Sequence, residues 1–224
     1  MLNNTPKATK NLIIINLIVF AATLINQNFM VGTFALFYPS SPYFRIWQII
    51  THMFMHGGVW HIFFNMYALY MFGSIIERTI GEKKFLILYF VCGFGAVLLH
   101  MGVQGIQESI FVNQMAAGSS TAVANYAALK NTPVLGASGA IYGLLITYAL
   151  LFPDARLSLV FLPFTSMSSK TWVLIFAAIE LFTGITGTVA GIAHFAHLGG
   201  MLFGWLLIKY WKKKGTLFDD YYGY

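Results

Sequence analysis

Six long apolar stretches constrain what this chain can fold into more than any other feature. A helix that crosses a membrane needs roughly 20 consecutive, mainly apolar residues. Only 9% of the 224 residues are charged, whereas a soluble domain carries about 25%. The sequence therefore predicts an all-α membrane protein, with one six-transmembrane-helix bundle over residues 1–224 and no second domain. The expected spans are about 11–30, 60–77, 84–101, 136–152, 171–189 and 191–211.

The basic residues predict the orientation of these spans. Lys and Arg are enriched in cytoplasmic loops near the ends of spans. If the N-terminus is inside, every basic residue except Arg45 and Lys130 falls on the cytoplasmic side. We therefore expect a multi-pass protein of the cell inner or plasma membrane with both termini in the cytoplasm. The net charge of +6 then reflects topology and contact with the lipid bilayer, and predicts no nucleic-acid partner.

Two segments between the spans have distinct compositions. Residues 31–50 are rich in aromatic residues and proline, which favours a connector lying at the membrane interface. Residues 102–134 are small and polar and are expected to form an aqueous loop on the outer side. A proline- and serine-containing loop is expected between the fourth and fifth spans.

Unusual polar residues recur at the outer ends of the second, fourth and sixth spans. His61 and Asn65 are four residues apart and share one face of the second helix. Ser138 begins the fourth span, and the sixth carries His194 and His197 near its outer end. Three helices thus deliver serine, histidine and asparagine to one depth, which indicates a shared site.

The glycines around Ser138 allow two interpretations. Gly139 and Gly143 form a GxxxG pair that is typical of close helix packing in membranes. Glycines beside a serine could equally leave room for a substrate backbone at a nucleophile. With Gly200 and Gly204 on the sixth span, close packing would also bring a short serine side chain within reach of an imidazole.

Serine hydrolysis needs a nucleophile, a base and donors for the oxyanion. Ser138 can be the nucleophile, and a histidine of the sixth span can be the base. The residues alone do not decide whether this base is His194 or His197. His61, Asn65 and the backbone N–H of Ser138 can stabilise the oxyanion, since the first N–H groups of a helix have no intrahelical partner.

No carboxylate is expected beside the histidine. Five of the seven acidic residues lie on the cytoplasmic side and Glu108 lies in the outer loop, while Glu180 falls near the middle of the fifth span. Counting residues along straight helices places Glu180 about 6 Å deeper than His197. We therefore expect a Ser-His dyad, with Glu180 either functional or a structural acid bonded to a neighbouring helix.

A metal site is the main alternative to serine hydrolysis that the residues allow. The chain has six histidines, and His52 and His56 have i, i+4 spacing. No HExxH motif occurs, and no carboxylate sits among the histidines to complete a hydrolytic zinc site. We therefore expect no metal and no cofactor, with His52 and His56 bracing the connector; a histidine-rich metal transporter is the less favoured alternative.

At these residues the chain resembles the rhomboid family of intramembrane serine proteases, over about residues 45–205. Four motifs carry the resemblance: His52-Met-Phe-Met-His56 continuing to His61-Ile-Phe-Phe-Asn65, Glu77-Arg-Thr-Ile-Gly81, Gly136-Ala-Ser138-Gly139, and Ala193-His194-Phe-Ala-His197-Leu-Gly-Gly200. A six-helix core resembles the bacterial form. Trp47-Gln48 stands where many members carry Trp-Arg, a departure that concerns the anchoring of the connector and not the chemistry.

The resemblance implies roles for single residues. Ser138 would be the nucleophile and His197 the base, with Tyr142 packed on the His197 ring. His61 and Asn65 would serve the oxyanion, beside Gly136 of the G-x-S-G motif. The implied substrates are transmembrane proteins, cut near the outer face after entry beside the 31–50 connector and the fifth span. A non-catalytic rhomboid-like protein that binds membrane clients is the alternative.

Overall fold

The computed structural model describes residues 4–159, 162–187 and 193–218, and within these ranges most of the chain is helical. The first half contains α1 (Lys7–Ile25), α2 (Gln27–Phe34), α3 (Gln48–Thr51), η2 (His52–Phe54), α4 (Val59–Ala68), η3 (Leu69–Gly73) and α5 (Ser74–Ile80). The second half contains α6 (Glu82–Ala116), α7 (Ser120–Asn131), α8 (Ser138–Leu151), β1 (Arg156–Leu159), β2 (Leu162–Ser168), α9 (Ser169–Thr186) and α10 (His194–Lys214).

Apolar helices confirm the predicted all-α membrane class. Among the described residues, α1, the continuous run Val59–Ile80, α6 and α9 are long and apolar enough to cross a membrane, and α8 is a shorter apolar helix. The fourth predicted span corresponds to α8. The fifth and sixth correspond to α9 and α10, although residues 188–189 and 191–192 of those predictions lie outside the described residues.

The first predicted span differs from the structure at both ends. Helix α1 begins at Lys7 and ends at Ile25, and the side chain of Asn26 then accepts a hydrogen bond from the N–H of Phe29. Asparagine is a strong N-cap, so the apolar residues after it form a separate helix, α2.

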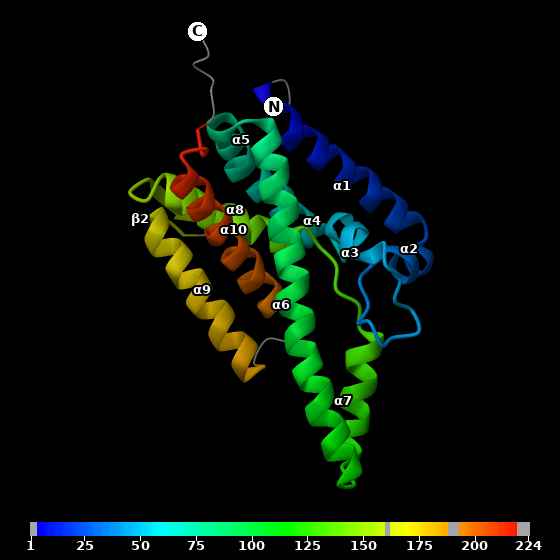
Figure 1. Cartoon of the computed structure of the whole chain (residues 1–224). Coiled ribbons are helices and arrows are strands. Elements are labelled where there is room, and N and C mark those ends of the chain that lie inside the picture. Colours follow the sequence, from blue (N-terminus) through cyan, green and yellow to red (C-terminus); the bar gives the residue numbers. More distant parts are fainter. Residues whose placement is uncertain (1–3, 160–161, 188–192, 219–224) are drawn as a thin grey trace.

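Helix α6 corrects the prediction of a long outer loop. It runs for 35 residues to Ala116, about 50 Å at 1.5 Å per residue, which exceeds a hydrocarbon core of about 30 Å. Helix α7 follows after a turn at Gly118 (φ 87°), where Ser119 caps its first turn. Residues 102–131 therefore form two helices exposed to solvent, which are separated by Ala117, Gly118 and Ser119. Figure 1 shows α7 packed along the extended end of α6.

The loop expected between the fourth and fifth spans contains an antiparallel hairpin. Strands β1 and β2 pair from Arg156 opposite Ser168 to Leu159 opposite Leu162. The side chain of Ser168 then caps the first turn of α9, so the hairpin leads directly into that helix.

Glycines bring α6, α8 and α10 into close contact at the centre of the bundle. A Cβ atom at Gly200 would collide with the carbonyl group of Gly139, and one at Gly204 would lie 2.8 Å from the carbonyl oxygen of Gly143. Cys92 of α6 is fully buried against Gly143. The predicted close approach of the fourth and sixth spans is confirmed, and it sets the distance between the residues at their ends.

The start of α1, the start of α6 and the end of α10 lie at one end of the bundle (Figure 1). An ion pair between Lys7 and Glu82 spans 3.9 Å, and Lys84 donates to the carbonyl oxygen of Thr216. The start of α1 and the end of α10 therefore lie on the same side of the helical bundle.

Candidate active site

Ser138 is the first residue of α8 and is held in place by the loop before it. Residue Val134 in this loop forms a two-way β-bridge with Leu36 of the connector, with both N–H to O distances at 2.8 Å. The N–H of Gly136 donates to the carbonyl oxygen of His52 at 2.9 Å. The connector therefore fixes the backbone that enters α8 and so the position of Ser138.

Gly136 cannot be replaced by a residue with a side chain without strain. Its φ of 131° is a conformation that L-residues rarely adopt. A Cβ atom here would lie 2.9 Å from Nε2 of His61 and 3.7 Å from Oγ of Ser138. Gly136 thus lets the imidazole of His61 approach the backbone immediately before Ser138.

His197 is the histidine that contacts Ser138. Its Nε2 lies 2.8 Å from the Ser138 Oγ, a hydrogen-bond distance. The ring of Tyr142, one turn further along α8, stacks on the His197 imidazole with centroids 4.1 Å apart and planes 6° apart. The packed rings restrict the rotation of the imidazole, which keeps Nε2 directed at the serine.

A carboxylate lies beside His197, so the expectation that none would reach it is wrong. Oε1 of Glu180 is 3.0 Å from Nδ1 of His197, an ion-pair distance, although the ring N–H does not point at the oxygen closely enough for a hydrogen bond. Tyr142 donates its hydroxyl to the same Oε1. Oε2 of Glu180 lies 2.6 Å from Nδ1 of His194, so this carboxylate joins α8, α9 and α10.

His61 is oriented by the turn before its helix. The N–H of Gly57 donates to Nδ1 of His61 across 3.4 Å. A neutral imidazole has one donor and one acceptor nitrogen, so this contact favours the proton on Nε2, the nitrogen that lies against Gly136. His61 is thereby disposed to donate toward the site.

Asn65 lies one turn after His61 on α4 and is 7% exposed. Its Nδ2 is buried with no hydrogen-bond partner among the described residues. A buried donor without a partner costs about 1–3 kcal/mol, so this amide group is available to a bound acceptor. Asn65 does not belong to the residues that line the cavity described next.

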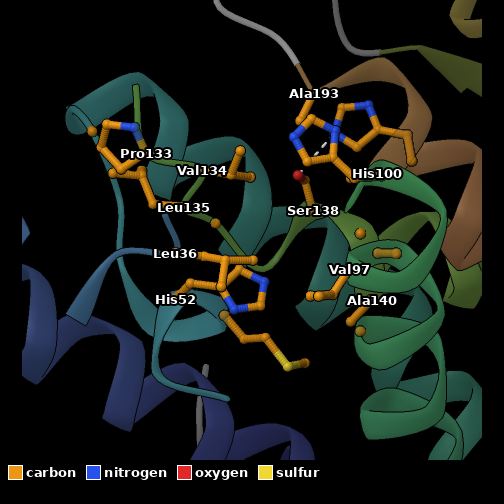
Figure 2. Close-up of a pocket in the computed structure, with 18 of the residues that line it drawn as sticks. Leu36, His52, Val97, His100, Pro133, Val134, Leu135, Ser138, Ala140 and Ala193 are labelled. Atoms are coloured by element: carbon orange, nitrogen blue, oxygen red, sulfur yellow. Dashed lines mark hydrogen bonds between the residues drawn. The ribbon is translucent and has the colours of Figure 1, made fainter. Parts of the chain in front are cut away.

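A cavity of about 640 Å³ opens beside Ser138. Figure 2 shows Ser138 at one wall, with Pro133, Val134 and Leu135 across from it. Its polar lining consists of His52, His61, His100, Gln104, Thr132, Ser138 and His197. His100 also lines the cavity, and both of its ring nitrogens are buried without a partner in the part of the chain described.

His52 braces the connector as expected, whereas the expectation is wrong for His56, which packs against His61 instead. Nδ1 of His52 donates to the carbonyl oxygen of Gln48 at 2.8 Å. Neither ring nitrogen of His56 has a hydrogen-bond partner among the described residues, and its ring packs edge-on against His61 with centroids 5.0 Å apart. Burial lowers the pKa of His52 to about 4, and burial with the neighbouring His61 lowers the pKa of His56 to about 4. Both rings are therefore neutral near pH 7.

Gln48 anchors the connector by its own hydrogen bonds. It is fully buried; its Oε1 accepts from the N–H groups of Phe37 and Arg45, and its Nε2 donates to the carbonyl oxygens of Thr33 and Tyr43. The neutral amide of Gln48 is both donor and acceptor, so it satisfies backbone groups of residues 33–37 and of residues 43–45.

The residues predicted from the sequence mostly gather at one place. Ser138, His197, Tyr142, Gly136 and His61 are brought together. The expected base was open between two histidines, and the structure pairs His197 with the serine and His194 with Glu180. The placement of Glu180 was missed, although its position as an intramembrane charge was the available signal. No group of three or more potential metal ligands occurs within the described ranges.

The family model for the Rhomboid domain matches residues 43–214. A relative from Danio rerio, presenilin-associated rhomboid-like protein A, mitochondrial, is 32% identical over 77% of this chain and 41% of its own length. The Homo sapiens presenilin-associated rhomboid-like protein, mitochondrial, is 27% identical over 96% of this chain and 52% of its own length.

RHOMBOID-like protein 4 of Arabidopsis thaliana is 29% identical over 72% of this chain and 33% of its own length. The chain thus spans about a third to a half of the length of these curated relatives. Two of the three are mitochondrial by name, so the comparisons support a membrane protein and give no support to the predicted bacterial form or cell inner membrane.

Proposed function

Because this chain belongs to the rhomboid family, whose model covers residues 43–214, we propose that it is an intramembrane serine protease that cleaves transmembrane segments of membrane proteins. The observation that carries the proposal is the 2.8 Å contact between Ser138 Oγ and His197 Nε2 beside a cavity. A serine hydrogen-bonded to an imidazole is the pair that nucleophilic acyl transfer requires.

In the proposed reaction, Ser138 is the nucleophile and His197 the general base. Oγ attacks the carbonyl carbon of the scissile peptide while its proton passes to Nε2, and the carbonyl electron pair moves to the oxygen. Collapse of this intermediate breaks the C–N bond, and the imidazolium returns the proton to the leaving amine. Water, with its proton taken by the same Nε2, then hydrolyses the acyl-enzyme.

Donors on the side of Ser138 that faces away from His197 would stabilise the oxyanion. The Nε2–H of His61 lies against Gly136, two residues before Ser138. The Nδ2 of Asn65 has no partner within the described structure, and the N–H of Ser138 is in the first turn of α8. Such donors, fixed before the reaction, stabilise developing charge without reorganisation.

A non-catalytic client-binding protein is the alternative function. It would need the cavity and the helix bundle but no hydrogen bond between a serine and an imidazole. The geometry of Ser138 and His197 therefore favours the protease.

The decisive test compares Ser138→Ala with wild type on a generic transmembrane substrate in detergent or liposomes. Wild type should cleave the substrate, and a fluorophosphonate should label it at Ser138. The variant should do neither, while Ser109→Ala, on the solvent-exposed part of α6, should behave as wild type. His197→Ala should abolish labelling, and His194→Ala should leave part of it. If the wild-type protein binds the substrate but neither cleaves it nor is labelled, the protease function is refuted and the client-binding function is favoured.

We also propose that both termini lie in the cytoplasm and α7 lies outside. The ends of α1 and α10 share one end of the bundle (Figure 1), and the basic residues concentrate there. An impermeant thiol reagent added from outside should reach Ser120→Cys and not Phe218→Cys, with the buried native Cys92 unreactive. The reverse pattern would overturn the orientation.

A further inference from the structure

The carboxylate of Glu180 is the point at which three helices meet beside the reacting pair. It is 8% exposed, and the side chains of His194 and His197 are 9% and 10% exposed. Its two oxygens face three groups: the hydroxyl of Tyr142 and the Nδ1 atoms of His194 and His197. The hydroxyl of Thr183, one turn along α9, lies 3.0 Å from the same Nδ1 of His194.

These partners indicate that the carboxylate is ionised and that both imidazoles carry a proton on Nδ1. An ionised carboxylate only accepts hydrogen bonds, whereas a tyrosine hydroxyl and an imidazole N–H can donate them. The proton on one imidazole nitrogen determines the role of the other. With Nδ1 of His197 protonated and facing Glu180, Nε2 is the acceptor nitrogen, and it is the one directed at Ser138.

We propose that Glu180 is a positioning residue of this site: it acts through His197, by selecting the tautomer that accepts the Ser138 proton and by stabilising the imidazolium that forms. This inference rests on the proposed protease function. The contact with His197 at 3.0 Å is electrostatic and not a well-aligned hydrogen bond. Its effect is therefore expected to fall short of the loss of about 10⁴-fold in kcat seen when a soluble serine protease loses its triad carboxylate.

His194 and Tyr142 hold the carboxylate where His197 needs it. The 2.6 Å contact between His194 and Oε2 fixes one oxygen, which leaves Oε1 for Tyr142 and His197. Tyr142 therefore has two separate contacts, its ring on the imidazole and its hydroxyl on the carboxylate. The second histidine of the sixth span thereby acquires a role that is distinct from that of the base.

The test is Glu180→Gln, which keeps the size of the side chain and removes its charge. The rate of fluorophosphonate labelling at Ser138 should fall by more than tenfold, and kcat for a transmembrane substrate should fall with little change in KM. Glu77→Gln is the matched control. Glu77 is the other buried glutamate of the described chain, and it accepts hydrogen bonds from backbone N–H groups of Ala8 and Thr9 far from the site. This control should keep the labelling rate within about twofold.

A spectroscopic measurement separates positioning from a purely structural role. In protein carrying ¹⁵N-labelled histidine, the His197 signals of wild type should show a protonated Nδ1 and an unprotonated Nε2. In Glu180→Gln, the tautomer protonated on Nε2 should be populated. In a His197→Ala background, Glu180→Gln should lower any residual labelling by less than about twofold, because residues that act as a unit are not additive.

Two results would overturn the inference: a Glu180→Gln protein labelled within tenfold of wild type, or one with unchanged His197 signals. If that variant does not fold, Glu180→Asp keeps the charge and withdraws it by one methylene; it should also lose more than tenfold in labelling, and full activity would contradict the role. A wild-type protein that is not labelled at Ser138 would refute the protease function itself, which is a different outcome.

Discussion

The two sides of Ser138 differ in how their polar groups are satisfied. On the side of α9 and α10, the side chains contact one another: His197 with Ser138, and Glu180 with Tyr142 and His194. On the side of α4 and α6, buried nitrogens lack a partner within the described residues. They are Nδ2 of Asn65 and both ring nitrogens of His56 and of His100.

In the proposed protease function, this difference corresponds to two tasks in acyl transfer. A base must be held in one orientation and tautomer before the substrate arrives, so its contacts belong to the protein. Donors for an oxyanion are needed only when negative charge develops, so they are directed at a position that substrate or water occupies. Most buried polar groups in proteins are paired, so the unpaired ring nitrogens of His100, which lines the cavity beside Ser138, indicate where a ligand oxygen binds.

The largest effect is expected from Gly136→Ala, which disturbs the donor side directly and shifts Ser138 itself. The φ of 131° and the 2.9 Å approach to His61 both resist a Cβ atom, and the loop would move Ser138. We expect kcat to fall by about 10³-fold, the upper range for a lost oxyanion donor. Gly102→Ala, at a helical glycine with open space around it, is the control and should not change the turnover.

Removal of a single donor should have the next largest effect. For Asn65→Ala and His61→Ala we expect a loss of about 10²–10³ in kcat with little change in KM, as for a lost oxyanion donor in a soluble serine protease. Asn65→Ala also removes a buried group that has no partner, so thermal unfolding should shift little. Two results would assign Asn65 a structural role: a large drop in unfolding temperature, or a rise in KM alone.

Tyr142→Phe should produce the smallest change and tests the base side. The stacked ring remains on His197, while the hydroxyl contact to Glu180 is lost. One hydrogen bond to a charged group contributes about 1.5–3 kcal/mol, and only the part that reaches His197 affects the rate. We expect labelling to fall by about threefold to tenfold, measured beside Tyr148→Phe as the control on the same helix. A loss larger than that of Glu180→Gln would mean that the hydroxyl acts on the substrate instead.

Much of this site could be predicted from local sequence. The i, i+4 spacing places His61 and Asn65 on one face of a helix. Glycines at Gly139, Gly143 and Gly200 predict the close contact of α8 with α10, and the structure confirms it. The rhomboid membership indicated by the motifs is confirmed by the family model. These features follow from short-range periodicity, which a sequence displays directly.

Only tertiary packing decided which histidine meets the serine. His194 and His197 are three residues apart on α10 and point to nearly the same side. The side on which α8 and α9 pack determines that one contacts Ser138 and the other contacts Glu180. The residue count along α10 is compatible with either arrangement.

The contact between Glu180 and His197 also could not be predicted from the sequence, for a geometric reason. Counting residues from the membrane surface assumes straight helices that begin at the same level. Helices α9 and α10 run in opposite directions and adjoin each other, and a glutamate side chain spans the remaining difference in depth to Nδ1 of His197. The sequence by itself determined the membrane class, the family and the residues at the helix ends. The pairing of side chains from α8, α9 and α10 was decided by how those helices pack, because contacts of a few ångströms between distant residues depend on helix offset and rotation, which periodicity does not specify.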